Sequence, residues 1–267
     1  MKTVLKPFQL LYVLYAVILF VVLMIPVFIW SLFALMLGHP RAGNMIYYAC
    51  MVWADLWCFL IFIRHRNFYK SKSDDENSYI YVSNHISYLD SAIVPKTFRH
   101  PVRPLGKVEM AKIPVFGFIY KNVIVAVDRS SAANRAKSVN ELKSLLKKGI
   151  SILVFPEGTF NTTGRPLKYF YDGAFRIAIE TGTAIRPVLL LDTYDRMRSV
   201  LSLNPGRSRA IFLEEIPVTG YTLEDTALLK EKVYASMQAA LKKYNYSWKN
   251  QASANDQEVT NLEKPVN

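Results

Sequence analysis

The stretch SYIYVSNHISYLDSAIVPK, residues 78–96, decides the fold, because a strand pattern, a polar turn and a helix pattern follow one another directly. Residues 78–83 combine aromatic and β-branched side chains, which favours a buried strand. Asn84 and His85 interrupt that run, and a short helix is predicted to begin near Ser87. A strand that leads straight into a helix is typical of an α/β domain.

The same alternation continues towards the C-terminus. We expect further strands at 102–110 (strand, then turn), 122–127, 150–155, 184–191 and 209–216, and helices at 131–148, 173–180 and 223–245. Strands alternating with helices predict a mixed, largely parallel sheet flanked by helices. The fold class is therefore α/β.

Upstream of residue 78 the chain is strongly apolar. Residues 8–37 are longer than about 30 Å of hydrocarbon requires, so this run must tilt or break, and Pro26 would suit a break. A second apolar run covers 45–63, interrupted by Asp55. Cations precede the first run and follow the second, with only Arg41 between them, which places both ends in the cytoplasm. Two spanning helices and a hairpin within one leaflet both satisfy this pattern.

These patterns divide the chain into three regions. We predict an N-terminal membrane-anchoring helical hairpin over 1–70, an α/β domain over 71–248, and a disordered polar tail over 249–267. The expected location is the inner (cytoplasmic) membrane of the cell, with the α/β domain on the cytoplasmic side.

Composition and charge limit the classes of binding partner that this chain can be expected to have. The chain is 51% hydrophobic and carries a formal net charge of +12, which suits an anionic membrane surface or acidic molecules. No Lys/Arg cluster is interleaved with aromatic residues, so no nucleic acid is expected as a partner. Cys50 and Cys58 lie in an apolar stretch and are interpreted as small hydrophobic residues without a disulfide. The histidines lack metal-ligand spacing, so no metal site is expected.

His85 and Asp90 form the first candidate site, because carboxyl ends of strands in open α/β sheets are where ligands bind. A carboxylate that accepts from one imidazole nitrogen fixes the tautomer and makes the other nitrogen a better base. The alternative is that Ser87 or Asp90 only caps the helix. Neither Ser83 nor Ser87 lies in a G-x-S-x-G turn, so His85 would deprotonate the hydroxyl of a bound acceptor directly.

A second candidate site follows the strand in ILVFPEGTF, residues 152–160. A turn at Gly158 exposes backbone N–H groups and Thr159 adds a hydroxyl, which together suit a phosphate. An ordinary turn with a hydrogen-bonded Glu157 is the alternative. Arg129, just after the strand at 122–127, could clamp an anion.

Additional cations lie near these two stretches in the sequence. Lys107, Arg165 and Lys168 could each add positive charge to a phosphate site. Each of them, taken alone, also fits an ordinary exposed cation.

Four motifs occur in order behind the apolar segment: NHISYLD, KVE…IPVFGF…VDR, FPEGT and AIRPV, within residues 78–190. Together they resemble the glycerolipid acyltransferase family, most closely its 1-acyl-glycerol-3-phosphate acyltransferases. The resemblance implies that His85 is the general base and Asp90 orients it. It also implies that the acceptor's glycerol phosphate is held by the remaining motif residues, Arg129, Glu157, Gly158 and Thr159. No metal, no cofactor and no covalent acyl-enzyme are implied.

The implied reaction transfers a fatty acyl group from a thioester, acyl-CoA or acyl carrier protein, to lysophosphatidic acid at a membrane, giving phosphatidic acid. Two departures concern the acceptor: Phe160 and Asn161 stand where the family commonly has Arg and Ser, and Arg186 replaces an apolar residue. One alternative acceptor is therefore another lyso-lipid, such as a hydroxylated amino-acid lipid. A non-catalytic lipid-binding membrane protein is the alternative from another class.

Overall fold

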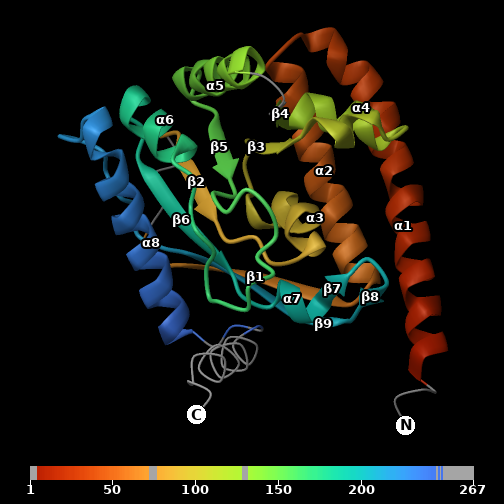
Figure 1. The fold of residues 1–267 in the computed structure, drawn as a ribbon. Coiled ribbons are helices and arrows are strands. Elements are labelled where there is room, and N and C mark those ends of the chain that lie inside the picture. Colours follow the sequence, from red (N-terminus) through yellow and green to blue (C-terminus); the bar gives the residue numbers. More distant parts are fainter. Residues whose placement is uncertain (1–4, 72–76, 128–131, 245, 247, 249–267) are drawn as a thin grey trace, which may run out of the picture.

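The computed structural model describes residues 5–71, 77–127, 132–244, 246 and 248 (Figure 1). Its strands are β1 (Ile63–Tyr69), β2 (Ile80–Ser83), β3 (Val102–Lys107), β4 (Val125–Val127), β5 (Ser151–Val154), β6 (Ile185–Leu190), β7 (Met197–Ser199), β8 (Ser202–Leu203) and β9 (Gly206–Phe212). Its helices are α1 (Leu5–Ala34), α2 (Arg41–Leu60), α3 (Tyr88–Thr97), α4 (Phe116–Val123), α5 (Ala132–Lys147), α6 (Gly173–Thr181), α7 (Thr193–Arg196) and α8 (Thr226–Lys243). Short 3₁₀ turns cover Leu35–Leu37, Val108–Lys112 and Leu223–Asp225.

The centre of the molecule is a seven-stranded sheet in the order β1-β9-β6-β2-β5-β3-β4. All neighbouring strands pair in parallel except β6 and β9, which are antiparallel. Consequently β2, β3, β4, β5 and β6 end at one edge of the sheet, where connecting loops can form a ligand site. The predicted α/β class with a mixed, largely parallel sheet is confirmed.

Helices cover both faces of the sheet, because the strands alternate apolar side chains between the two faces. Ile80 and Val82 of β2 join the core beneath α5, α6 and α8, whereas Tyr81 joins the core beneath α2 and α3. Figure 1 shows these two helical layers on opposite sides of the sheet. The β2 strand is therefore enclosed by helices on both of its faces.

The first apolar run forms one long helix. Residues Pro7–Leu37 are long and apolar enough to cross a membrane, and this is the single such helix among the described residues. Most of its large apolar side chains are exposed. Of the two alternatives, a tilt or a break at Pro26, the helix shows no break, because α1 continues through that residue. A proline removes one backbone N–H donor, which a long helix can tolerate.

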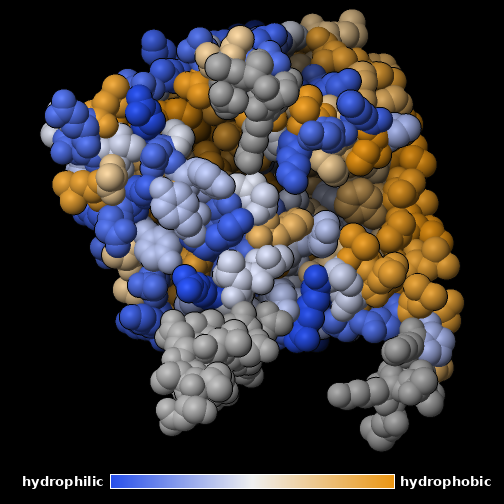
Figure 2. All heavy atoms as spheres, in the orientation of Figure 1, coloured by the Kyte–Doolittle hydropathy of each residue, from blue (hydrophilic) through white to orange (hydrophobic). Residues whose placement is uncertain are grey.

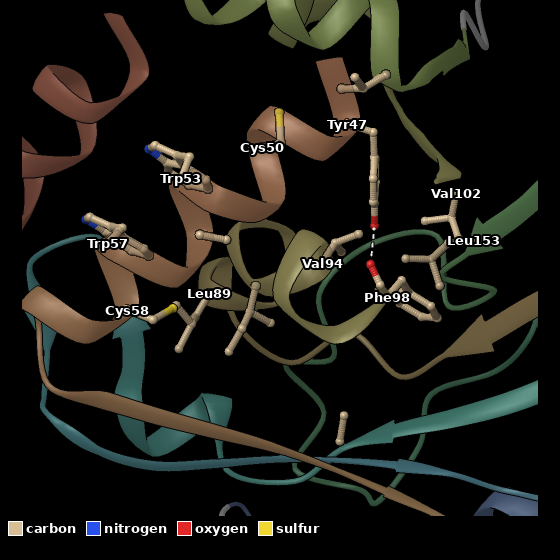
Figure 3. Packing of buried hydrophobic residues seen from close by; sticks show 14 of the residues in the cluster. Tyr47, Cys50, Trp53, Trp57, Cys58, Leu89, Val94, Phe98, Val102 and Leu153 are labelled. Atoms are coloured by element: carbon tan, nitrogen blue, oxygen red, sulfur yellow. Dashed lines mark hydrogen bonds between the residues drawn. The ribbon is translucent and has the colours of Figure 1, made fainter. Parts of the chain in front are cut away.

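The second helix, α2, packs between α1 and the α/β domain. Figure 3 shows Trp53 and Trp57 on its side towards α1, where their stacked rings lie 5.6 Å apart. On the other side the Tyr47 hydroxyl donates to the Phe98 carbonyl (3.1 Å), as Figure 3 also shows. Since one side of α2 belongs to the domain core, a membrane hairpin of two equivalent helices is not established. Both cysteines are buried and unpaired with each other, as predicted.

Several elements escaped prediction. The basic segment after α2 is β1, an edge strand that pairs with β9 far along the chain. The region predicted to be anchor alone, 1–70, thus contributes a strand to the sheet. The α4 helix and the β7–β8 hairpin were also missed. The tail at 249–267 lies outside the described residues.

Candidate active site

The loop after β2 begins with an asparagine that fastens it to the next strand. The Asn84 side chain donates to the Leu190 carbonyl (3.0 Å) and accepts from the Leu190 N–H (2.8 Å). Asn84 is buried, and this amide pair replaces the strand pairing that ends at Ser83. The backbone at His85 is therefore held at the carboxyl edge of the sheet.

His85 and Asp90 meet as the sequence suggested. His85 Nδ1 lies 3.0 Å from Asp90 Oδ2, and the Asp90 side chain is completely buried while that of His85 is 14% exposed. A buried carboxylate at this distance fixes the proton on Nδ1 and leaves Nε2 as the basic nitrogen. The same oxygen accepts the backbone N–H groups of Ile86 (2.7 Å) and Ser87 (2.8 Å).

Asp90 also caps α3. Ser87 and Asp90 form a reciprocal capping box, in which the Ser87 hydroxyl accepts from Leu89 N–H (3.1 Å). One carboxylate thus caps the helix and also lies within hydrogen-bond distance of His85. The Ser87 hydroxyl itself donates to the Met197 carbonyl (2.7 Å) and is not bonded to His85.

Aromatic rings enclose the imidazole. Phe155 stacks on His85 at 4.1 Å with an interplanar angle of 17°, and Phe160 lies 4.2 Å away at 48°. Tyr88 extends this wall, with its ring 4.5 Å from Phe160 and its side chain half exposed. These rings hold the imidazole plane and exclude water around the base, which strengthens its interaction with Asp90.

Glu157 supports the two loops from inside. It is completely buried, and its two oxygens accept the backbone N–H groups of His85 (3.1 Å) and Lys168 (3.1 Å). Burial raises the pKa of the Glu157 carboxyl to about 8, and the charge of Asp90 adds to this rise, while the two N–H donors oppose it. Both carboxyl oxygens of Glu157 thus accept hydrogen bonds within the protein, as the hydrogen-bonded interpretation of this residue expects.

The turn after Glu157 is exposed. Gly158 has a φ of +73°, a left-handed conformation that suits glycine. Thr159 is exposed and its hydroxyl accepts from Lys168 Nζ (2.9 Å). Thr159 and Lys168 therefore present a hydroxyl and a cation together, as an anion site requires.

Within the part of the chain that the structure describes, Lys107 and Arg186 make no hydrogen bond to the loops after β2 and β5. Lys107 ends β3 at the same edge of the sheet and is exposed. Arg129 lies outside the described residues. Arg186 turns away from this edge, since its Nη2 donates to the Ser71 carbonyl (2.8 Å) and its guanidinium lies over the Tyr79 ring.

Asn161 and the aromatic wall were not recognised as parts of the site. The Asn161 N–H donates to the His85 carbonyl (2.7 Å). Asn161, noted in the sequence only as a departure from the family's motif, therefore contacts the loop after β2, residues 84–87, here called the histidine loop. The signal was present in their position directly after EGT, but it required knowing that β2 and β5 are neighbours. The described residues hold no cluster of His, Cys, Asp and Glu suited to a metal.

This arrangement can perform base chemistry where the loops after β2 and β5 meet. Residues 63–191 match the family model described as Acyltransferase. The sequence is 28% identical over 187 residues to a chloroplastic 1-acyl-sn-glycerol-3-phosphate acyltransferase of Arabidopsis thaliana, covering 68% of this chain and 51% of that protein. It is 31% identical over 151 residues to a 1-acyl-sn-glycerol-3-phosphate acyltransferase of Haemophilus influenzae, covering 55% and 61%. The matches thus span only about half to three-fifths of these relatives.

A solved structure agrees in fold. The crystal structure of the 1-acyl-sn-glycerophosphate (LPA) acyltransferase PlsC from Thermotoga maritima superposes with a TM-score of 0.71 at 20% identity, covering 92% of this chain and all (100%) of that one. At this identity the likeness concerns the fold. The family model and the curated relatives agree with the motifs after β2 and β5, so the chain is similar to the acyltransferase family over residues 63–191.

Proposed function

We propose that this chain transfers a fatty acyl group from a thioester to the free hydroxyl of 1-acyl-glycerol-3-phosphate, giving phosphatidic acid. The observation that carries the proposal is the His85–Asp90 pair, with a buried carboxylate 3.0 Å from Nδ1 at the carboxyl edge of the sheet. The names of the relatives, 1-acyl-sn-glycerol-3-phosphate acyltransferases, support the same acceptor.

The proposed mechanism uses His85 as general base. Asp90 keeps the proton on Nδ1, so Nε2 accepts the proton of the acceptor hydroxyl as its oxygen attacks the thioester carbonyl. The C–S bond then breaks, and the thiolate takes the proton from the imidazolium. A thiol, with a pKa of about 8.5, is a good leaving group, so acceptor activation is the step that the base assists by about 10²–10⁴-fold. No acyl-enzyme forms.

The exposed turn after β5 supports a role in holding the acceptor. Gly158 and Thr159 would contact the phosphate, with Lys168 supplying charge through its bond to the Thr159 hydroxyl. Lys107 and Arg129 would approach from β3 and from the segment after β4. Glu157 would act by setting the spacing of the two loops, because its carboxylate bonds both backbones.

The membrane supplies the acceptor. We propose that residues 1–70 anchor the chain as a helical hairpin and also provide β1, and that 71–248 complete the catalytic domain, with 249–267 as a polar tail. The exposed apolar surface of α1 supports this arrangement. The active site would face the cytoplasm at the inner membrane, where acyl-CoA or acyl carrier protein is the donor.

One observation favours a second acceptor. Phe160 places a ring, not a cation, 4.2 Å from His85. A less charged lyso-lipid, such as a hydroxylated amino-acid lipid, would meet a smaller loss of hydration beside that ring. The reaction would remain an O-acyl transfer by the same base.

The test uses the full chain in phospholipid vesicles, labelled acyl-CoA or acyl carrier protein, and a panel of lyso-acceptors. We expect transfer to lysophosphatidic acid and a loss of about 10²–10⁴-fold with His85→Ala. His100→Ala, a substitution outside the loops after β2 and β5, is the matched control. Equal activity of wild type and His85→Ala would contradict the mechanism, and no transfer to any acceptor would favour a lipid-binding protein.

A further inference from the structure

The β7–β8 hairpin carries an exposed apolar turn beside the first turns of α1. Val200 and Leu201, between the two strands, are 54% and 66% exposed. Contacts between α1 and β8 place the hairpin beside the first turns of α1, and Gln9 Nε2 donates to the Ser202 hydroxyl (3.5 Å). The turn therefore lies next to the helix that is apolar enough to cross a membrane.

Exposed apolar side chains also lie on the neighbouring helix and at the junction that follows α2. Leu11 and Leu14 on α1 are 62% and 54% exposed, and Phe62, between α2 and β1, is 66% exposed. The Tyr12 hydroxyl donates to the Ile61 carbonyl, which ties α1 to this junction. In Figure 2 the hydrophobic surface over α1 extends towards the area where Figure 1 labels β7 and β8. Such an exposed apolar area needs a partner.

Arginines border the same area. Arg64 follows the exposed Phe62 by two positions, and Arg198, with a side chain 58% exposed, precedes Val200. In the parallel β1–β9 pair, Arg64 lies opposite Arg207, whose side chain is 65% exposed and whose Nε lies 3.8 Å from Asp192 Oδ2. Arg198 likewise pairs with Asp195 (3.0 Å), so each of these two arginines has one carboxylate beside it, and the exposed Arg64 adds a further cation. The charge complement of this border is an anionic surface.

The hairpin is also bonded to the histidine loop. The carbonyl of Met197, the first residue of β7, accepts the Ser87 hydroxyl (2.7 Å). The Ser87 N–H in turn donates to Asp90 Oδ2 (2.8 Å), the oxygen that faces His85. One residue therefore joins the hairpin to the carboxylate that orients the base.

We propose that the β7–β8 hairpin is a second membrane contact, in which Val200 and Leu201 enter the leaflet that holds α1 and Arg64, Arg198 and Arg207 face anionic headgroups. The contact fixes the height of the histidine loop above the lipid through Ser87 and Met197. Its catalytic consequence rests on the proposed function, but the contact itself does not.

The first test measures depth in the membrane. Full-length chain carrying Leu201→Cys, labelled with an environment-sensitive dye, is placed in vesicles that contain phosphatidylglycerol and lipids with a quencher on the acyl chain. The native cysteines are buried, so the introduced thiol takes the label. Leu228→Cys, on α8 and 62% exposed, is the matched control. We expect strong quenching at 201 and little at 228; equal quenching at both positions overturns the proposal.

The second test varies charge. Each cation near an anionic surface strengthens attraction by about 1 kcal/mol, so Arg64→Gln should weaken docking of the labelled hairpin about fivefold in phosphatidylglycerol vesicles. Lys148→Gln, an exposed lysine just beyond α5, should leave docking unchanged. An equal loss with both variants, or no loss with Arg64→Gln, would refute the headgroup contact.

The third test separates this proposal from the enzymatic one. Val200→Ser combined with Leu201→Ser should lower acyl transfer to a vesicle-borne acceptor several-fold and leave transfer to a monomeric short-chain acceptor unchanged. Equal loss on both acceptors would contradict the hairpin's role in catalysis at the surface. Absence of transfer by wild type would end the proposed function, whereas quenching at 201 would still establish the membrane contact.

Discussion

The loops after β2 and β5 end neighbouring parallel strands, yet they are built differently. The first, at 84–87, is buried and bonded at nearly every polar group, with Asp90 Oδ2 accepting from two backbone N–H groups and facing His85. The second, at 156–161, rests on the buried Glu157 but exposes Thr159. A base must be held in one geometry, whereas a loop that contacts different acceptors can vary without disturbing it.

Under the proposed function, the first loop would carry out the reaction and the second would set the preference among acceptors. Substitutions in the first should change the rate with every acceptor, because each acceptor needs the same proton transfer. Substitutions in the second should change the ranking of acceptors. Four predictions test this division, beginning with the largest expected effect.

Asp90→Asn should reduce kcat by about 10²–10⁴-fold with every acceptor. The amide cannot stabilise an imidazolium as a carboxylate does. It would also bury an N–H₂ group where Asp90 Oδ1 has no hydrogen-bond partner among the described residues. Steady-state kinetics check this, with Glu180→Gln, in a surface ion pair with Lys143, as control. A loss of kcat that differs between acceptors would contradict the assignment of the reaction to the first loop.

Glu157→Gln should alter the pH dependence of stability. The folded pKa of Glu157, about 8, is above its ordinary value of 4.5, so the folded state binds a proton more tightly than the unfolded state. This contribution is complete below pH 4.5 and is lost as pH rises to about 8, with a slope of at most about 1.4 kcal/mol per pH unit. Thermal unfolding of both proteins between pH 5 and about 8 measures it. The difference between their Tm values should change with pH, and a constant difference would be contrary to this prediction.

Phe160→Arg should change acceptor preference by about 10- to 150-fold in favour of phosphorylated acceptors, because a charge-assisted hydrogen bond to phosphate is worth about 1.5–3 kcal/mol. Competition between lysophosphatidic acid and an uncharged lyso-lipid gives the ratio directly. Phe160→Leu, which keeps an apolar side chain, is the control. An unchanged ratio with Phe160→Arg would show that Phe160 has no part in selecting the acceptor.

Thr159→Val should raise KM for a phosphorylated acceptor about three- to tenfold and leave kcat nearly unchanged, since one neutral hydrogen bond contributes about 0.5–1.5 kcal/mol. Thr162→Val, an exposed threonine of the same loop, should have no effect. A fall in kcat without a change in KM would indicate that Thr159 assists the proton transfer to His85 and does not bind the acceptor.

The sequence predicted what depends on local pattern. The strand at 78–83, the turn at His85 and the cap at Asp90 follow from neighbouring residues, and the structure brings them together as expected. The contact of Phe160 with His85 could not be predicted in this way, because it depends on β2 pairing with β5. β1 was missed for the same reason, since its alternating arginines resemble the flank of a membrane helix until β9 is placed beside it.

The β1–β9 pairing also determines when the sheet can be completed during translation. His65 bonds Ser208, 143 positions later in the chain, so β1 leaves the ribosome long before its partner exists. At about 5–20 residues per second the wait is on the order of ten seconds, while α1 and α2 are already available to the membrane. Arg64 and Arg66 give this waiting edge a charge that discourages pairing with other strands. The last strand of the sheet then joins the first, so the segment after α2 becomes part of the folded domain only after β9 has been synthesised.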